Sequence, residues 1–498
     1  MKLKEILKGV RTISVSGDAE AEISGISYDS RKVAAGHLFV AIRGGKFDGH
    51  DFVEDAIARG AAAIMYEKTG TVTPVEALSQ KRPAVSLIRV EDSREAIACA
   101  AGNFFMKPSE ALTVVAITGT NGKTTTAYLV KSIIECWGMK AGLVGTIRYM
   151  AGDKTYDAPH TTPEAPDFQE MLRTMLAEGC THVAVEVSSH ALTQKRVEGT
   201  TFRAAVFTNL TRDHLDFHGS MENYFLAKER LFTGLLSEKG TAVINFDDPY
   251  GRRLLAGMGR GRQVLTYGLE AGPDLRATEI DNSFGGLRFK INVRGRAYNV
   301  VSPLMGLPNV YNILAAAGVS ASIGVPWKII VEGIGNSRMV KGRFEKVDAG
   351  QGFLAVIDYA HTEDALERLI YTARGLTEGK IITVFGCGGD RDRGKRPAMG
   401  SIATRLSDFV IITSDNPRSE RPERIIQEIE AGATRKNYLI EPDREAAIRR
   451  AVLIAQENDV VLVAGKGHED YQEIEGKRFK FNDREVLERA IRQMINNT

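Results

Sequence analysis

The sequence predicts an α/β protein with three domains, whose sheets are largely parallel. The chain has 498 residues, too many for one ordinary hydrophobic core. From about residue 112 onward, apolar runs of strand length alternate with amphipathic stretches of helix length, a pattern typical of helices that cover a sheet buried on both faces. Several apolar runs end directly in glycine-rich or charged loops, as parallel strands do at a binding edge.

Composition excludes several classes of protein. A hydrophobic content of 43% and a formal charge of +2 describe a soluble globular chain without an overall field for nucleic acid or anionic membranes. The four cysteines are widely spaced, so we expect free thiols in a reducing compartment. No run approaches the ~18 apolar residues of a membrane span, and the N-terminus lacks a signal-peptide pattern. We therefore expect a cytoplasmic protein.

The first expected domain, residues 1–107, mixes short strands with short helices. Strands are expected at 38–42, 62–66 and 84–90, and a helix is expected at 93–105. Lys107-Pro108 then marks a boundary.

The second expected domain, residues 108–338, begins with a β-branched strand at 112–117. A helix follows, with an apolar face and with Gly138 at its end. Further strands are expected at 181–187, 204–210 and 241–245, and a β-rich insertion at about 263–303. The alternation predicts a parallel sheet covered by helices.

The third expected domain, residues 339–498, repeats the alternation. Its strands are expected at 353–358, 381–385, 409–413 and 460–464. The last three run into loops that contain Arg391, Asp415-Asn416-Pro417-Arg418, and Gly465 with Glu469. Because ligands bind outside the carboxyl ends of parallel strands, these loops predict one composite site.

The loop between the strand at 112–117 and its helix is the most informative motif. It reads Thr118-Gly119-Thr120-Asn121-Gly122-Lys123-Thr124-Thr125. Glycines let the backbone approach phosphate oxygens, helix N–H groups point at them, and Lys123 adds a positive charge. Thr124 is placed to put a hydroxyl on Mg²⁺. The general spacing requires glycine at 117, where this chain has Ile117. The motif predicts an ATP-dependent enzyme with a shorter form of the loop.

Three other positions have both a functional and a plain structural interpretation. Glu186 ends a buried strand, where it can hold Mg²⁺ or form a helix cap or a solvated turn. His214 lies in the acidic, histidine-containing stretch 208–218, where it can orient a Mg²⁺ site or be a solvated loop residue; no spacing supports zinc. Periodicity alone makes Lys228 an exposed lysine on an amphipathic helix.

The turn at 415–418 carries groups that suit a zwitterionic amino acid. Arg418 offers a planar fork for a carboxylate, and Asp415 can meet an ammonium group. A capping turn explains Asp415 and Asn416 equally well.

Taken together, these residues resemble the Mur ligases, the ATP-dependent amide-forming enzymes of peptidoglycan precursor synthesis. The short loop T-G-T-N-G-K-T is the form that this family uses. Further matching stretches are 28–31, 160–164, 186–190, 213–218, 224–232, 306–312, 358–361 and the three C-terminal loops. The resemblance implies an N-terminal domain that grips a uridine nucleotide, a central P-loop-type ATPase domain and a Rossmann-like C-terminal domain that binds an amino acid.

The resemblance also implies ligands for named residues. The UDP-linked substrate is expected at Tyr28, Ser30, Gly45, Lys46, Phe47, His160 (where relatives often have asparagine), Thr161, Thr162, Ser188, Gln194 and Arg196. ATP is expected at Gly119, Thr120, Asn121, Gly122, Lys123, Thr124, Thr125, Asn309, Arg343 and Asp358. The amino acid is expected at Arg391, Asp415, Asn416, Pro417, Arg418, Gly465 and Glu469. In this family the lysine that matches Lys228 is carbamylated, which makes N6-carboxylysine, and Mg²⁺ is then expected at Thr124, Glu186, His214 and Lys228.

The implied reaction adds meso-2,6-diaminopimelate to the D-glutamate of UDP-N-acetylmuramoyl-L-alanyl-D-glutamate through an acyl phosphate, with Lys123, Lys228, Glu186 and His214 as catalytic groups. The resemblance implies a monomer in the bacterial cytoplasm, with no nucleic-acid or membrane partner. A lysine-adding homologue and a folylpolyglutamate synthetase are the nearest alternatives. A P-loop regulatory ATPase is a third, but it needs no amino-acid pocket.

Overall fold

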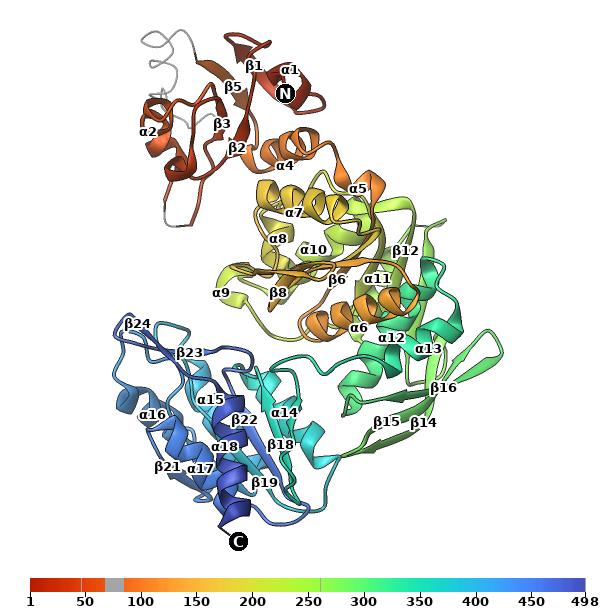
Figure 1. Ribbon diagram of the computed structural model, residues 1–498, viewed down its shortest axis with the longest axis vertical. Coiled ribbons are helices and arrows are strands. Elements are labelled where there is room, and N and C mark those ends of the chain that lie inside the picture. The colour runs from red at the N-terminus through yellow and green to blue at the C-terminus, as the bar shows by residue number, and fades with distance from the viewer. Residues whose placement is uncertain (46, 68–84, 260, 498) are drawn as a thin grey trace.

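The computed structural model describes residues 1–45, 47–67, 85–259 and 261–497. Three α/β bodies follow one another along the long axis of the molecule, in chain order (Figure 1). The α/β class expected from the sequence is confirmed. None of the helices in these ranges is long and apolar enough to cross a membrane.

The N-terminal sheet has the strand order β1-β5-β4-β3-β2. Its strands pair in parallel, except that β1 runs antiparallel to β5. The expected strands and the expected helix at 93–105 are present, the latter as α4. The elements are β1 (Thr12–Ser16), β2 (Gly25–Ser27), β3 (His37–Val40), β4 (Ala63–Glu67), β5 (Ser86–Val90), α1 (Leu3–Ile6), α2 (Val53–Ala58) and α4 (Ser93–Phe104).

The central sheet is mixed, with the order β16-β15-β14-β13-β12-β11-β6-β10-β7-β8-β9. Its middle, from β14 to β7, is parallel as expected. Antiparallel strands extend both edges, through the expected β-rich insertion at one side and the β8–β9 hairpin at the other. The strands are β6 (Thr113–Thr118), β7 (Ala141–Val144), β8 (Arg148–Ala151), β9 (Lys154–Asp157), β10 (His182–Glu186), β11 (Phe202–Phe207), β12 (Leu236–Asn245), β13 (Gln263–Gly268), β14 (Leu275–Ser283), β15 (Gly286–Val293) and β16 (Arg296–Ser302).

Helices cover both faces of this sheet because its central strands are apolar on both sides. In β6, Val115 and Ile117 join one core, while Val114 and Ala116 join the other, as the period of two in a strand requires. One core includes α6 (Lys123–Cys136), α12 (Leu307–Ser322) and α13 (Trp327–Gly335). The other includes α7 (Ala165–Ala177), α8 (Ser189–Thr193), α10 (Met221–Arg230) and α11 (Pro249–Gly257). The short helices α5 (Pro108–Ala111) and α9 (Leu215–His218) complete the domain.

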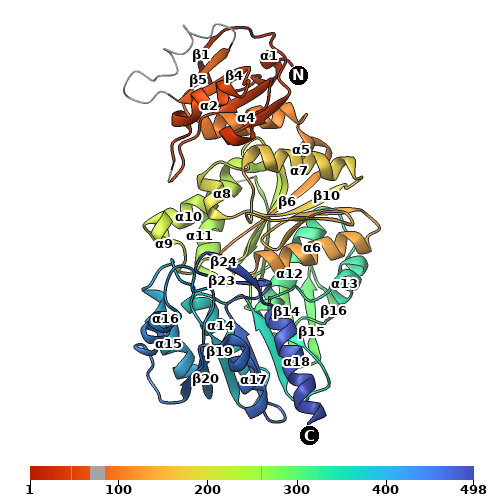
Figure 2. The ribbon, with the colours of Figure 1, turned by 60° about the vertical axis from the view of Figure 1, so that its left-hand side comes forward.

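The C-terminal sheet has the order β17-β18-β22-β19-β20-β21, parallel except for β17. Its β23–β24 hairpin lies on the side that faces the central domain (Figures 1 and 2). The strands are β17 (Glu345–Val347), β18 (Leu354–Asp358), β19 (Ile381–Phe385), β20 (Phe409–Ile412), β21 (Tyr438–Ile440), β22 (Val460–Ala464), β23 (Tyr471–Ile474) and β24 (Lys477–Lys480). The helices are α14 (Glu363–Arg374), α15 (Lys395–Leu406), α16 (Pro422–Glu430), α17 (Arg444–Ile454) and α18 (Asp483–Asn496).

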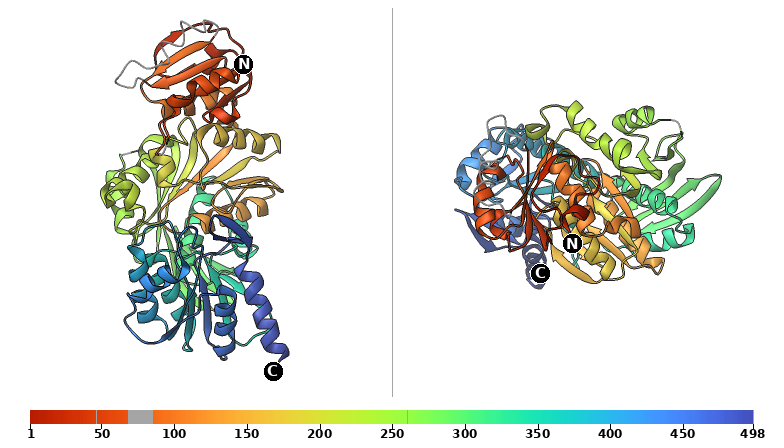
Figure 3. Two further views of the ribbon diagram at one scale, coloured as in Figure 1. Left: turned by 90° about the vertical axis from the view of Figure 1, so that its left-hand side faces the viewer. Right: turned by 90° about the horizontal axis from the view of Figure 1, so that it is seen from above.

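The N-terminal and C-terminal domains lie at opposite ends of the central one in every side view (Figure 3, left). A ligand that spans all three domains must therefore be long. Among the described residues, the central domain contacts both of the others.

Candidate active site

The glycine loop between β6 and α6 has a conformation that requires its glycines. Gly119 has φ +148°, and a Cβ there would lie 1.9 Å from Thr208 Oγ1. Gly122 has φ +86°, and its Cβ would lie 2.3 Å from Asn312 Oδ1. Both values lie in the region that favours glycine. The backbone is thus packed closely against neighbouring strands and helices where it turns into α6.

Residues just after β11 hold the glycine loop through hydrogen bonds that were not expected from the sequence. Asn209 accepts the N–H groups of Thr120 (2.9 Å, at its carbonyl) and Asn121 (2.9 Å, at Oδ1). Thr208 Oγ1 donates to the Asn121 carbonyl at 2.6 Å. Two polar residues directly after an apolar strand, Thr208-Asn209, were the sequence feature from which this support could have been predicted.

Lys123 opens α6 and bends back over the loop. Its Nζ donates to the carbonyls of Gly119 and Thr120, both at 2.8 Å. Burial lowers the pKa of this lysine, and the charge of Glu186 opposes that effect. The ammonium therefore lies where phosphate oxygens would meet it.

A cavity of about 680 Å³ opens beside the loop and is shared by the central and C-terminal domains. Of the residues expected to bind ATP, all but Gly119 line it. These lining residues are Thr120, Asn121, Gly122, Lys123, Thr124, Thr125, Asn309, Arg343 and Asp358.

Arg343 and Asp358 bring the C-terminal domain to the cavity. The Arg343 guanidinium lies over the Tyr359 ring at 5.0 Å, and its NH2 donates to Thr124 Oγ1 at 3.5 Å. Among the described residues its buried Nε has no hydrogen-bond partner, which leaves donor capacity for an anion. The Asp358 carboxylate accepts the N–H groups of Phe344 (2.6 Å) and Ala360 (2.8 Å), while burial raises its pKa.

Asp364 on α14 adds a direct link between the domains. Its Oδ2 accepts from Asn121 Nδ2 at 3.1 Å and from Thr211 Oγ1 at 2.9 Å. The first contact reaches the glycine loop itself, and no motif in the sequence indicated it.

Glu186 lies at the end of β10 and is fully buried, at 0% exposure. Its carboxylate accepts from Thr124 Oγ1 at 2.8 Å, from Thr146 N at 2.9 Å and from Thr146 Oγ1 at 3.0 Å. Thr146 was missed, although it lies just after the end of the neighbouring strand β7. A carboxylate and a hydroxyl in direct contact are hard oxygen donors of the kind that Mg²⁺ takes, so these two residues fit the expected metal.

Lys228 is not the exposed lysine that periodicity alone suggested, since it is 1% exposed. Its Nζ donates to the Gly119 carbonyl at 3.0 Å and lies 4.6 Å from the centre of the Tyr224 ring. Burial lowers its pKa well below the ordinary value, Lys123 adds to the effect, and Asp213 opposes it. Packing of α10 against the glycine loop therefore places this lysine directly beneath the expected phosphate site.

His214 belongs to a cluster of aromatic and imidazole rings beside Lys228. Its backbone has φ +53°, and its side chain is 45% exposed. The ring centres of His190 and His214 are 4.8 Å apart, and burial lowers the pKa of His190 to about 4. Within the described ranges, no three His, Cys, Asp or Glu side chains gather closely enough to hold a metal. The expected Mg²⁺ site has only Glu186 and His214 from these residue types. Its other expected ligands are the Thr124 hydroxyl and a carboxylated Lys228.

The residues expected at the muramoyl-peptide form a connected group. Arg196 donates to the Thr162 carbonyl at 2.8 Å and to Gln194 Oε1 at 2.6 Å, and its buried Nε has no hydrogen-bond partner in the part of the chain that the structure describes. Thr162 Oγ1 donates to the Glu186 carbonyl at 2.7 Å. Thr161 and Ser188 line the large cavity. His160 is exposed, and its carbonyl accepts from Tyr149 at 2.5 Å.

The residues expected at the UDP end do not form a hydrogen-bonded group like the one around Arg196 and Thr162, as far as the described residues show. The Tyr28 hydroxyl donates to Asp167 Oδ2 at 2.6 Å, which joins the N-terminal and central domains. Ser30 is buried, Phe47 is 72% exposed, and a Cβ on Gly45 would meet no atom within 4 Å. Lys46 lies outside the described residues.

The three C-terminal loops meet as the strand pattern predicted. Arg418 donates to the Gly389 carbonyl at 2.7 Å, and Asn416 Nδ2 donates to Glu469 Oε2 at 2.7 Å. A Cβ on Gly465 would lie 2.5 Å from Asp415 Oδ2, so glycine leaves room for that carboxylate. A Cβ on Gly389 would lie 1.9 Å from the Pro417 carbonyl, and Arg391 follows Gly389 in the same loop. The three loops thus lie in contact with one another.

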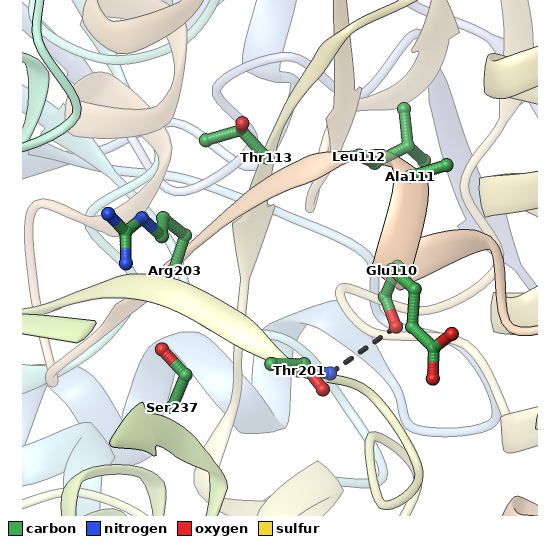
Figure 4. A pocket seen from close by; sticks show the side chains of 8 residues that line it. Glu110, Ala111, Leu112, Thr113, Thr201, Arg203 and Ser237 are labelled. Atoms are coloured by element: carbon green, nitrogen blue, oxygen red, sulfur yellow. Dashed lines mark hydrogen bonds between the residues drawn. The ribbon is translucent and has the colours of Figure 1, made fainter. Parts of the chain in front are cut away.

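A second cavity, of about 350 Å³, lies at the other end of the central sheet (Figure 4). Thr113, Arg203 and Ser237 line it, near the starts of β6, β11 and β12. The glycine loop follows the opposite end of β6, so this cavity is separate from the expected ATP site.

A glycine loop that faces a cavity shared by two α/β domains is typical of nucleotide-binding proteins. Three family models match successive parts of the chain: the Mur ligase family catalytic domain at 22–105, the Mur ligase middle domain at 117–320, and the Mur ligase glutamate ligase domain at 342–467.

Relatives match over nearly the whole chain. A UDP-N-acetylmuramoyl-L-alanyl-D-glutamate–2,6-diaminopimelate ligase from Solibacter usitatus is 48% identical, covering 99% of this chain and 98% of that protein. A solved structure of a ligase with the same name is 33% identical, with a TM-score of 0.70 and 99% coverage of both chains. The MurF ligase of Thermotoga maritima in complex with ADP shares the fold, at 20% identity, a TM-score of 0.60 and coverage of 95% of this chain and 97% of that one. The chain belongs to the Mur ligase family.

Proposed function

We propose that this chain is an ATP-dependent, ADP-forming ligase that adds meso-2,6-diaminopimelate to the D-glutamate of UDP-N-acetylmuramoyl-L-alanyl-D-glutamate. The observation that supports it most is the pairing of two sites. A cavity with a glycine loop serves ATP, and a separate cluster around Arg418 and Glu469 serves an amino acid. Similarity at 48% identity to a ligase named for these substrates supports the same assignment.

The first chemical step forms an acyl phosphate. The D-glutamate carboxylate attacks the γ-phosphorus of ATP, the bond to the β,γ-bridging oxygen breaks, and ADP leaves. The loop N–H groups and Lys123 stabilise the charge that develops on the phosphate oxygens. Arg343 supplies a further positive charge from the C-terminal domain. When bound, Mg²⁺ neutralises phosphate charge, and Thr124, Glu186, His214 and carboxylated Lys228 would hold it.

The second step forms the amide. The amine of diaminopimelate attacks the acyl carbon, phosphate leaves, and the amine loses a proton. Asp415 and Glu469 offer negative charge to the ammonium of the distal amino-carboxylate centre, while Arg418 and Arg391 suit its carboxylate. For this attack the two domains must hold the amine next to the acyl carbon. Holding the reactants together in this way lowers the activation barrier.

We place this reaction in the bacterial cytoplasm, in the peptidoglycan synthesis that supports cell wall biogenesis, cell shape, division and the cell cycle. We further propose that the chain works as a monomer, without a nucleic-acid or membrane partner. The formal charge of +2 supports the absence of a nucleic-acid partner.

Phosphate release tests the function. With ATP and UDP-N-acetylmuramoyl-L-alanyl-D-glutamate present, meso-diaminopimelate should support turnover and L-lysine should not. Lysine lacks the distal carboxylate and would leave an arginine without its partner. Sites built for a polar group discriminate against an analogue that lacks it by about 10⁴-fold in kcat/KM. Equal turnover with the two amino acids contradicts the proposal.

Substituting Arg418 should affect the amino acid specifically. In Arg418→Ala the KM for diaminopimelate should rise by about 10- to 100-fold, since a charged hydrogen-bonding partner is lost. The KM for ATP should stay unchanged, because Arg418 does not line the ATP cavity. Arg421→Ala, at an exposed position outside the turn, is the matched control. An unaltered KM for the amino acid in Arg418→Ala shows that its guanidinium does not contact the carboxylate.

A further inference from the structure

Lys466 is a fully buried lysine that the proposed reaction does not yet use. It follows β22, between Gly465 and Gly467, and its side chain is 0% exposed. A buried ammonium is rare unless it is paired. Its partners are two of the residues expected to bind the amino acid.

The hydrogen bonds of Lys466 fix the orientation of the Asn416 amide. Lys466 Nζ donates to Asn416 Oδ1 at 3.0 Å, and Glu473 N donates to the same oxygen at 2.9 Å. A flipped amide would turn its NH₂ group toward these two donors. Asn416 Nδ2 is therefore held toward Glu469 Oε2, at 2.7 Å.

The same ammonium contacts the Glu469 carboxylate. Lys466 Nζ lies 3.3 Å from Glu469 Oε2. Asn416 and Lys466 thus both donate to Oε2 of Glu469. Within the described part of the chain, Oε1 of Glu469 has no hydrogen-bond partner. That oxygen therefore retains acceptor capacity for an ammonium.

We propose that Lys466 is a positioning residue of the amino-acid site, whose ammonium orients Asn416 and keeps Glu469 anionic for the distal ammonium of the substrate. This inference rests on the proposed function, because it assigns Glu469 to an amino acid with such a centre. Lys466 itself does not touch the substrate in this arrangement.

The charges around Glu469 agree with this role. Burial raises the pKa of Glu469, Asp415 raises it further, and Lys466 is the leading opposing group, with Asn416 contributing. Arg444, buried behind the site, and the rings of Tyr359 and Tyr471 also face this carboxylate. Arg444 is already paired with Asp483, at 2.7 Å and 2.8 Å. Lys466 is thus the cation in direct contact with Glu469.

Lys466→Gln tests the role of the charge, since glutamine keeps a donor for Asn416. The KM for diaminopimelate at pH 7 should rise about tenfold or more, with little change in the KM for ATP. Because the anionic Glu469 is the binding form, KM rises as pH falls through its pKa. Without the lysine that pKa is higher, so this rise should begin about one to three pH units higher than in the unaltered protein.

Lys477→Gln, on the exposed strand β24, is the matched control and should leave both KM values and the pH profile unaltered. A Lys466→Gln protein that melts at lower temperature but keeps the original KM and pH profile overturns the proposal. If Lys466→Gln does not fold, Glu469→Gln is compared with Lys466→Gln/Glu469→Gln, in which no charge is left buried alone. Their KM values should agree within about twofold, and a further rise in the double variant overturns the proposal.

The amino acid that the unaltered protein accepts is established first and used throughout. Failure of the proposed function therefore appears in the unaltered protein as a different substrate preference. Failure of the Lys466 inference appears only in the comparison between variants.

Discussion

Lys228→Ala should reduce ligase turnover by about 10³-fold or more, the scale seen when groups that stabilise transferring charge are removed. Lys228 is almost fully buried and donates to the Gly119 carbonyl of the glycine loop, where we propose that phosphate binds. An unmodified ammonium there would repel a metal ion, whereas a carboxylated lysine offers oxygen ligands. Alanine removes the side chain on which we propose that the carboxylate forms. The measurement is phosphate release with all three substrates saturating.

Rescue distinguishes loss of the carboxylate from loss of the fold. Small carboxylic acids such as formate or acetate should restore part of the Lys228→Ala turnover, because they fit the space that the side chain vacates. Lys239→Ala, at an exposed position in β12, should keep full turnover and should not respond to the acids. A fully active Lys228→Ala removes this residue from the mechanism.

Lys123→Met should reduce kcat/KM for ATP by about 10²- to 10³-fold, as expected for the loss of one electrostatic stabiliser of the transferring phosphoryl group. Its Nζ lies over the loop, within hydrogen-bond distance of two carbonyls. Methionine keeps the length and apolar stem of the side chain, so the change removes mainly the charge. Steady-state kinetics over a range of ATP concentrations provide the measurement.

Lys140→Met is the matched control, since Lys140 is exposed and lies outside the cavity. It should retain the original kinetic constants. Thermal melting of both variants separates an effect on folding from one on catalysis. Unchanged ATP kinetics in a folded Lys123→Met protein contradict phosphate contact by this lysine.

Much of the fold follows from sequence because the strands of its parallel sheets are apolar on both faces. Strands β6, β10 and β22 were expected within one or two residues of their bounds. The β8–β9 hairpin was missed. Its two strands, Arg148–Ala151 and Lys154–Asp157, have four residues each and lie at a sheet edge, and the second is largely polar. Strands of this kind carry neither a continuous apolar run nor a long alternation.

The candidate site divides in the same way between local and long-range information. The glycine loop and the turn at 415–418 are each a single short stretch of sequence, so their chemistry could be predicted from the sequence. Lys228 and Asp364 act through packing between segments that lie far apart in sequence. Periodicity shows which face of a helix is apolar, but it does not show which loop that helix will cover. Only the resemblance to the Mur ligases drew attention to Lys228.

The contacts of Asp364 with Asn121 and Thr211 have a thermodynamic consequence. They connect the wall of the cavity beside the glycine loop to the C-terminal domain, in which we propose the amino-acid site. A nucleotide in this cavity touches both domains, so its affinity depends on how the two domains are placed relative to each other. Coupling of this kind is reciprocal: whatever factor the amino acid applies to nucleotide affinity, the nucleotide must apply to amino-acid affinity.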